Sequence, residues 1–283
     1  MKRNPMIVKS SGEKMPFAPE KLRKSLLHSG APSGVVDTIV QRVSEEIYEE
    51  MSTREIYNRA FSLLRKYKEA CASRYKLKKA IYELGPTGFP FERFVSAVLN
   101  HSGHKTRTNQ IYKGHCVDHE IDVVAENTRG TTLIECKFHS DEGKKCDVKI
   151  PLYIHSRFRD IERWNERRGE TRVHLKPAWV VTNTRFTRDA EKYGKCAGLY
   201  LLSWNHPPKN SLKRRIDRSG LYPITVSTLL SAREKEFLLG RVVVLCKELL
   251  GAPYLLDHMG ISDPRKKRIL FEFTQLSNVF STP

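Results

Sequence analysis

The amino-acid sequence predicts a mixed α/β (α+β) protein with three domains. One apolar stripe at helical spacing indicates a buried helix early in the chain and consists of Val36, Val40, Val43 and Ile47. Three strand-like segments in succession, followed by a strand–helix–strand unit, indicate a mixed sheet in the middle. Runs rich in Gly and Pro at 85–90 and in Pro at 206–210 mark the boundaries. We therefore expect domains at 1–85, 86–206 and 207–283.

The first domain is predicted to be mainly helical. Residues 6–17 read as two short strands around a Ser-Gly turn, and a helix begins at Pro19 and ends at Gly30. Ser52 and Glu55 have the spacing of a capping box, which predicts a helix over 53–64. A further, lysine-rich helix is expected to end near Gly85.

The central domain is predicted to have the order αβββαβ, with one more helix and strand after it. The expected helices lie at 91–100, 151–169 and 187–196, and the expected strands lie at 107–114, 119–127, 131–139, 178–183 and 199–204. The first three strands should form a meander, and the last two should pair in parallel. In the small C-terminal domain we expect helices over 231–250 and 264–276.

Charge and cysteine content limit the classes of function. Lys and Arg number 50 against 32 acidic residues, which gives a formal net charge of +18 and indicates a polyanionic partner. The six cysteines show no metal-binding spacing and predict reduced thiols, most of them in the core. No segment has the length of a membrane span or the pattern of a signal peptide. We therefore expect a cytoplasmic protein that binds nucleic acid and no membrane.

The segment LIECKF carries the chemistry. Glu135 and Lys137 leave one face of the strand, while Ile134 and Cys136 leave the other. Asp122 lies in the preceding strand, so two carboxylates could converge beside one amine. Carboxylate oxygens bind Mg²⁺ or Mn²⁺, and such an ion promotes phosphodiester hydrolysis. The alternative is a surface aspartate beside an ordinary cross-strand ion pair.

The pattern resembles the PD-(D/E)XK nuclease superfamily, and within it the Mrr-like restriction endonucleases. The resemblance covers roughly residues 86–206 and rests on four segments: FPFERF, HEIDVV, LIECKF and AWVVTNTRFTRDAEKYGKCAGLYLLSW. It implies that Asp122 and Glu135 are metal ligands, that Lys137 is catalytic and that Glu92 is an accessory carboxylate. Ile121 stands where the family name has proline, a position that supplies no ligand.

Three further residues near this pattern have two interpretations each. His119 either touches substrate or metal, or is a hydrogen-bonded strand residue. Tyr153 and Arg157 either face DNA phosphates or belong to a solvated helix face.

Residues 7–30 resemble the ATP-cone, a nucleotide-sensing module of ribonucleotide reductases and their regulator. The matching pieces are Val8-Lys9, Gly12, Pro16-Phe17 and Lys21, then Thr53-Arg54-Glu55-Ile56 and the helix over 72–84. The resemblance implies that ATP or dATP binds here as a regulatory ligand, with Lys9, Lys21 and Thr53 as contacts. Lys9 and Lys21 could also offer two cations to a triphosphate on charge alone.

These observations support three hypotheses. The first is a Mg²⁺-dependent DNA endonuclease of restriction or defence type, gated by an adenine nucleotide. The second is a nucleotide-sensing DNA-binding regulator that does not cleave, and the third is a nuclease acting on RNA or branched DNA. The tail could bind DNA or form a dimer surface, with Lys266-Lys267-Arg268 as phosphate contacts or a solvated face. We expect a homo-oligomer.

Overall fold

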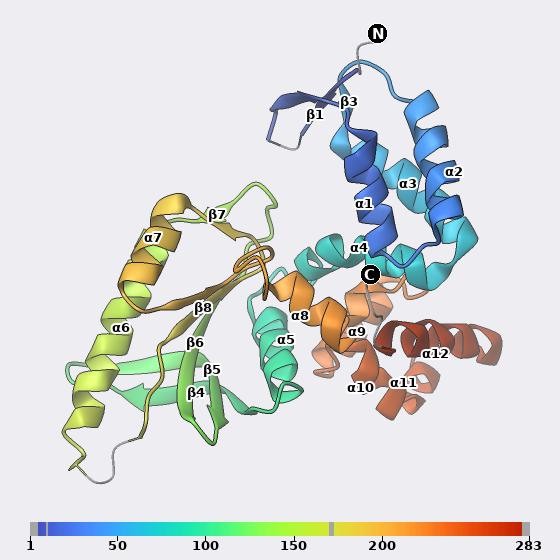
Figure 1. Cartoon of the computed structure of the whole chain (residues 1–283). Helices are drawn as coiled ribbons and strands as arrows, with labels where there is room; N and C mark the ends of the chain where they lie inside the picture. The colour runs from blue at the N-terminus through green and yellow to red at the C-terminus, as the bar shows by residue number, and fades with distance from the viewer. Residues whose placement is uncertain (1–4, 10, 170–172, 279–283) are drawn as a thin grey trace.

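Figure 1 shows the computed structural model of the chain, which describes residues 5–9, 11–169 and 173–278. The predicted mixed α/β fold is confirmed: helices precede and follow a central mixed sheet. Across the described part of the chain, none of the helices is both long and apolar enough to cross a bilayer. All six cysteines are free, and four of them are buried, namely Cys71, Cys136, Cys146 and Cys246.

The N-terminal domain combines a small sheet with four helices. β1 (Met6–Val8) pairs antiparallel with β2 (Lys14–Pro16), as the sequence predicts. β1 also pairs in parallel with β3 (Met51–Ser52), which is too short to show an alternating pattern in the sequence. The helices are α1 (Pro19–His28), α2 (Ser33–Glu45), α3 (Thr53–Tyr67) and α4 (Glu69–Tyr82).

Two details of this domain differ from the sequence prediction. Val36 and Val43 of the predicted stripe are buried in α2, and Val40 and Ile47 are partly buried and pack against the same core. Ile47 does so from beyond the end of the helix at Glu45, and Ile39, which the prediction omitted, is also buried. The hydroxyl of Ser52 does cap α3 by accepting the N–H of Glu55 at 3.1 Å. The carboxylate of Glu55, however, binds neighbouring side chains, so the predicted reciprocal capping box is not completed.

The central domain is built on a five-stranded sheet with the order β10-β8-β6-β5-β4. Its strands are β4 (Lys105–Lys113), β5 (Asp118–Asn127), β6 (Gly130–Lys137), β8 (Trp179–Thr182) and β10 (Tyr200–Leu202). The first three form the predicted antiparallel meander, and β6, β8 and β10 pair in parallel, also as predicted. β7 (Lys145–Cys146) and β9 (Arg185–Phe186) form a separate two-stranded pair.

Helices cover both faces of this sheet (Figure 1). α5 (Phe89–Asn100) packs on one face, where Ile134 and Cys136 of β6 enter the same core as Phe91. α6 (Lys149–Glu166) and α7 (Arg188–Cys196) lie on the other face, where Leu133 packs against Ile161. The predicted alternation of β6 between an apolar face and a charged face therefore follows from its position between two helical layers.

The C-terminal domain consists of short helices. They are α8 (Leu212–Ser219), the 3-10 helix η2 (Ile224–Val226), α9 (Ala232–Gly240), α10 (Cys246–Gly251), α11 (Tyr254–His258) and α12 (Asp263–Ser277). The single helix predicted over 231–250 was wrong. It is interrupted at Val242, whose φ of 64° is incompatible with a continuing helix, and the next residues turn into the core.

α4, in the first predicted domain, also packs with the two predicted domains that follow it. Its first turn, with Cys71 and Ala72, packs in the core of the N-terminal domain, whereas Leu77 and Ile81 pack in the core shared by α5 and the C-terminal helices. Glu272 of α12 is 1% exposed and accepts a hydrogen bond from Ser73 of α4 at 2.5 Å. A single helix therefore links the predicted sensor to the predicted nuclease domain.

Candidate functional site

The predicted site lies where β5 stops pairing with β6. The ladder between the two strands runs from Asn127 to Val123 and then ends. The next residue, Asp122, turns its carboxylate toward β6, where Oδ2 accepts the backbone N–H of Cys136 at 2.7 Å. Opposite Asp122 on β4, Asn109 has a φ of 53° and the pairing is also irregular. The side chain of Asp122 thus replaces a ladder hydrogen bond at a break in the sheet.

Glu135 lies beside this break and is held by two cations. Its carboxylate is almost fully buried. Lys137 donates to Oε1 at 2.6 Å, and Arg157 of α6 donates to Oε2 at 2.7 Å. A second guanidinium nitrogen of Arg157 donates to the backbone carbonyl of Glu120. Both oxygens of Glu135 are therefore occupied by charges from the chain itself.

Glu92, in the first turn of α5, completes a group of acidic side chains. Burial, together with the negative charges of Asp122, Glu135 and Glu120, raises the pKa of Glu92 to about 7. α5 packs directly on β5 and β6, the strands that carry Asp122 and Glu135. The structure therefore brings Glu92 to the predicted site, and this glutamate can gain or lose a proton near neutral pH.

Burial and neighbouring charges also shift the pKa values of Asp122 and Lys137. Burial and the charge of Glu135 raise the pKa of Asp122 to about 6, although the N–H of Cys136 and the positive charge of Lys137 act against the rise. Burial disfavours the charged form of Lys137, but its hydrogen bond to Glu135 and the charge of Asp122 prevail and raise the pKa of the amine. Lys137 therefore remains a cation at neutral pH and cannot act there as a base.

Among the described residues, no group of three or more His, Cys, Asp or Glu side chains is placed so that it could hold a metal ion by itself. Mg²⁺ does not need such a group, because it commonly binds one or two carboxylates together with water and substrate phosphate. Asp122 and Glu135 supply two such carboxylates. Burial raises the pKa values of Asp122 and Glu92, and so do the neighbouring carboxylates, whose effect a cation bound at this place would oppose.

The polar residues flanking this pattern have structural partners. His119 pairs with Asp160 of α6 at 2.8 Å, and Asp160 also accepts the backbone N–H groups of Cys116 and Val117. This contact fixes the β4–β5 turn on α6, so the structure favours the second interpretation of His119. Tyr153 is exposed and lies under the guanidinium of Arg157, 5.5 Å from its ring centre.

The turn after β8 supports the end of β6. The side-chain amide of Asn183 accepts the N–H of His139 at 2.9 Å and donates to the carbonyl of the same residue at 2.8 Å. The hydroxyl of Thr182 donates to the carbonyl of Lys137 at 2.7 Å. Because Asn183 and Thr182 are fully buried, they hold the backbone from Lys137 to His139 in a fixed position.

A cleft with a volume of about 660 Å³ separates the N-terminal domain from the loop that follows β6. Thr53 lines it, as do residues that the sequence analysis did not single out, among them Tyr57, Tyr75 and Lys79. The rings of Tyr57 and Tyr75 stack with their centres 5.0 Å apart. These residues come from different helices, and α3 and α4 must pack together to create the cleft.

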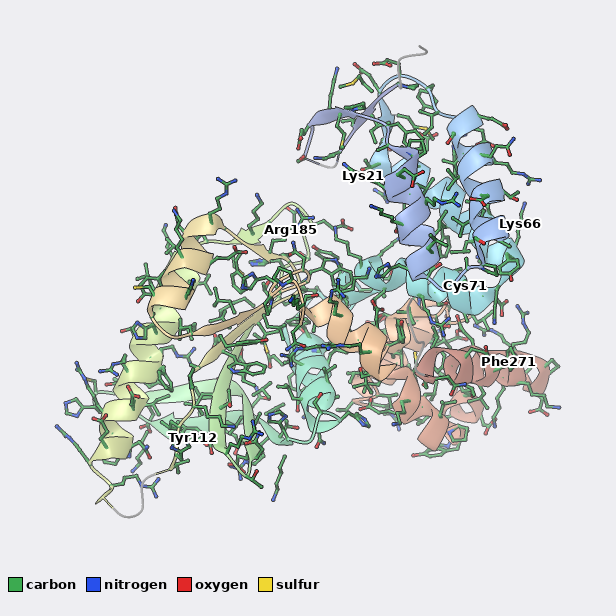
Figure 2. All side chains as sticks on the ribbon, viewed as in Figure 1. Lys21, Lys66, Cys71, Tyr112, Arg185 and Phe271 are labelled. Atoms are coloured by element: carbon green, nitrogen blue, oxygen red, sulfur yellow. The ribbon has the colours of Figure 1, made fainter. Side chains whose placement is uncertain are left out.

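The two lysines predicted to bind nucleotide lie elsewhere. Lys9 pairs with Glu13 at 2.9 Å, and Lys21 is an exposed residue of α1 that adds its positive charge near Glu13. Figure 2 shows Lys21 and Lys66 on the surface of the N-terminal domain. Neither Lys9 nor Lys21 belongs to the lining of the cleft, so the structure brings only Thr53 of the three predicted contacts to it.

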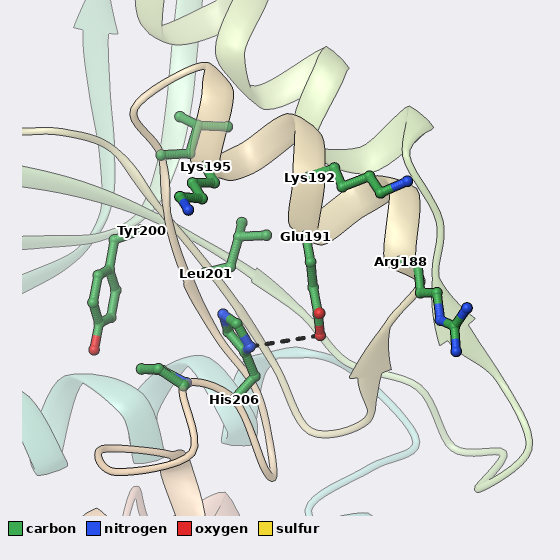
Figure 3. A pocket seen from close by; sticks show the side chains of 9 residues that line it. Arg188, Glu191, Lys192, Lys195, Tyr200, Leu201 and His206 are labelled. Atoms are coloured by element: carbon green, nitrogen blue, oxygen red, sulfur yellow. Dashed lines mark ion pairs between the residues drawn. The ribbon is translucent and has the colours of Figure 1, made fainter.

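A second hollow, of about 480 Å³, lies between α7 and β10 at the edge of the sheet (Figure 3). It is lined by several cations, and Figure 3 shows Glu191 joined to His206, at a distance of 3.5 Å. None of the predicted site residues lines it. In the tail, Lys266 pairs with Asp257 and Arg268 pairs with Glu69, so these two basic side chains hold helices together.

Comparison with known proteins places this architecture in a family. A family model described as AF1548-like, C-terminal, matches residues 222–277. The chain is 34% identical over 182 residues to a protein of Archaeoglobus fulgidus described as uncharacterized, and the alignment covers 63% of this chain and 97% of that protein. The crystal structure of the protein of unknown function AF1548 is similar with a TM-score of 0.55 and 30% identity, over 67% of this chain and 98% of that one. The chain therefore belongs to the AF1548-like family.

Proposed function

We propose that this protein is a metal-dependent endonuclease, of restriction or defence type, that hydrolyses phosphodiester bonds in DNA. The observation that carries the proposal is the meeting of Asp122, Glu135, Lys137 and Glu92 at the break between β5 and β6. Two carboxylates at this position suit Mg²⁺ or Mn²⁺. A bound ion would polarise the phosphate and lower the pKa of an attacking water.

The other side chains of the site would each have a separate role in the reaction. Lys137 carries a positive charge beside Glu135, so it can stabilise the negative charge that develops on the phosphate. The pKa of Glu92 is about 7 in the metal-free protein, and a cation bound to Asp122 and Glu135 would lower it, so that Glu92 would be ionised and could accept a proton from water at neutral pH. Asp122 is anchored by the N–H of Cys136, which fixes the direction of its carboxylate.

The choice of DNA as substrate rests on charge and on the chemistry of the site. The chain carries a formal net charge of +18, which favours a polyanion. RNA and branched DNA are polyanions with the same phosphodiester bond, so a panel of substrates must separate these three. The free cysteines agree with a reducing compartment, and we propose the cytoplasm.

We further propose that ATP or dATP regulates the enzyme by binding in the cleft lined by Thr53. The cleft volume of about 660 Å³ lies within the range of small-molecule sites. The stacked rings of Tyr57 and Tyr75 suit an adenine base, and Lys78 and Lys79 suit phosphates. Lys9 would contribute only if the β1–β2 hairpin moved toward the cleft, and Lys21 only if α1 moved with it.

The cleft is adjacent to the catalytic strand. Ser140, Asp141 and Glu142 form one wall of the cleft, and they follow Lys137 after only a few residues. Glu142 pairs with Lys78 of α4 at 3.5 Å. A phosphate group that binds Lys78 would displace Glu142 and so change the loop that leaves the site.

The experiment is a cleavage assay with purified protein, Mg²⁺ and linear duplex DNA, with and without ATP or dATP. We expect cleavage by the native protein, and a loss of at least about 100-fold in Asp122→Asn, Glu135→Gln and Lys137→Met. Glu126→Gln is the matched control, because Glu126 lies on β5 at the far end of the strand and pairs with Arg107. It should cleave like the native protein.

Cleavage that all three site variants retain would contradict the proposal. Salt-sensitive DNA binding without cleavage by the native protein would instead support a nucleotide-sensing regulator. A preference for RNA or for branched DNA would keep the chemistry and change the substrate. Sedimentation of the same samples tests whether the protein forms the homo-oligomer that we expect.

A further inference from the structure

We infer that Arg157 has two successive partners: it holds Glu135 in the metal-free protein, and it binds the phosphodiester once Glu135 binds a cation. This inference rests on the proposed nuclease function and adds a residue to its site. Arg157 comes from α6, a different element from the strands that carry Asp122, Glu135 and Lys137.

Both carboxylate oxygens of Glu135 already have cationic partners. Oε1 accepts from Lys137 at 2.6 Å and Oε2 accepts from Arg157 at 2.7 Å, and the carboxylate is only 7% exposed. A cation that binds Glu135 must therefore compete with one of these two side chains. In a buried position, two positive groups and a divalent ion cannot all remain around one carboxylate without strong repulsion.

The surroundings of Lys137 and Arg157 indicate which of the two would release Glu135 when a cation binds. Lys137 lies two residues from Glu135 on the same strand face, and the charge of Asp122 also attracts it. Arg157 reaches Glu135 from a helix through a long side chain, and its second hydrogen bond goes to the neutral carbonyl of Glu120. Arg157 therefore keeps a hydrogen-bond partner, the carbonyl of Glu120, when it releases Glu135, whereas Lys137 would give up its hydrogen bond to that carboxylate.

Once it releases Glu135, the guanidinium of Arg157 has a place close to the site. The Arg157 side chain is 14% exposed, and the ring of Tyr153 lies 5.5 Å from its charged centre, on the exposed side of α6. The guanidinium therefore stays close to the site rather than moving into solvent. A planar guanidinium binds phosphate oxygens through two parallel hydrogen bonds, whereas a lysine amine acts as a point charge. A phosphodiester is the anion that the proposed reaction brings to this place.

The test compares Arg157→Gln, Arg157→Lys and the control Arg159→Gln in the full chain. Arg159 lies on the same helix, is more than half exposed and pairs only with Glu162 among the described residues. Mn²⁺ binding is measured by isothermal titration calorimetry without DNA, and cleavage is measured separately with Mg²⁺. Thermal melting of each variant establishes that it is folded.

The two readouts should move in opposite directions. Arg157→Gln should bind Mn²⁺ about tenfold more tightly, because its competitor for Glu135 is gone, and should cleave at least about tenfold more slowly. Arg157→Lys should restore the weaker Mn²⁺ binding but little of the cleavage, and Arg159→Gln should match the native protein. A purely structural role for Arg157 would weaken both.

The outcomes separate this inference from the proposed function. If the native protein binds Mn²⁺ and cleaves DNA, but Arg157→Gln binds Mn²⁺ equally or less tightly, then the inference is wrong and the nuclease proposal stands. If Arg157→Gln binds Mn²⁺ more tightly and cleaves at the native rate, then the phosphate contact is wrong. If the native protein neither binds Mn²⁺ nor cleaves, then both proposals fail.

Discussion

The carboxylate of Asp122 accepts the backbone N–H of Cys136 at 2.7 Å, across the point where β5 and β6 stop pairing. This bond gives one side chain two tasks. The carboxylate satisfies the N–H of Cys136, which would otherwise lose its partner, and the bond holds this carboxylate beside the strand segment that carries Glu135. The break in the sheet is therefore the feature that makes room for the site.

Removing the charge of Glu92 should stabilise the metal-free protein at alkaline pH. The unfolded glutamate has a pKa near 4.5 and the folded one near 7, so folding disfavours the ionised form. This cost is absent below about pH 4.5, grows as the pH rises toward 7 and is complete above 7. Glu92→Gln should therefore raise the free energy of unfolding at pH 8 by roughly 1 kcal/mol, a value reduced for solvent screening, and should change little at pH 4.5.

Urea unfolding at the two pH values, in the presence of a chelator, measures this effect. Glu126→Gln serves again as the control, because its carboxylate pairs with an exposed arginine. A Glu92→Gln variant that is less stable at pH 8 than the native protein would show that the acidic cluster does not repel itself as described.

The cleft should lose its nucleotide when its aromatic or basic lining is removed. Tyr75→Ala removes one of two stacked rings, and Lys79→Gln removes a cation at the same wall. We expect each to weaken ATP and dATP binding about tenfold, as measured by calorimetry with the full chain. Lys66→Gln, an exposed lysine of α3 outside the cleft, should bind like the native protein. Equal binding by all three variants would place the nucleotide elsewhere.

The ion pair between Glu142 and Lys78 should transmit the response to nucleotide. This pair holds the loop after β6 against α4, and a phosphate must displace Glu142. Glu142→Gln should therefore tighten ATP binding by a fewfold and reduce the difference between cleavage rates with and without ATP. The pair is well exposed, so the effect on stability should stay below about 1 kcal/mol. An unchanged ATP response would mean that the sensor acts through another contact.

The buried carboxylate of Glu272 should be important for joining the domains. It accepts from the hydroxyls of Ser73 and Ser227 and from the N–H of Thr228. Glu272→Ala leaves these buried donors without an acceptor and should cost roughly 3 kcal/mol of unfolding free energy, as measured by urea denaturation. Glu236→Gln, at an exposed position of α9, should cost almost nothing. Similar losses in both variants would mean that the buried network contributes little.

Most of the central domain could be predicted from the local pattern of the sequence. In LIECKF, apolar and charged residues alternate, and the structure places Ile134 and Cys136 in the core with α5 while Glu135 faces Arg157 of α6. The pairing of β4, β5 and β6 followed from their short connections. Such features depend on neighbours along the chain, which is why they can be predicted from one sequence.

Other features depend on contacts between distant segments. The stacked pair Tyr57 and Tyr75 becomes a cleft wall only when α3 packs on α4, and no spacing in the sequence indicates it. The break between α9 and α10 occurs at Val242, a residue type that rarely adopts a positive φ. The bond from Arg157 to Glu135 likewise joins a helix to a strand distant in the sequence, so the sequence left Arg157 with two interpretations.

A diffraction experiment on crystals soaked in Mn²⁺ would show directly whether Asp122 and Glu135 bind a divalent cation. The anomalous signal of manganese locates the ion without relying on activity. If Asp122 and Glu135 are metal ligands, a peak is expected within coordination distance of both, with Arg157 displaced from Oε2 of Glu135. A peak elsewhere, or no peak while Glu135 remains bound to Lys137 and Arg157, would contradict their role as metal ligands.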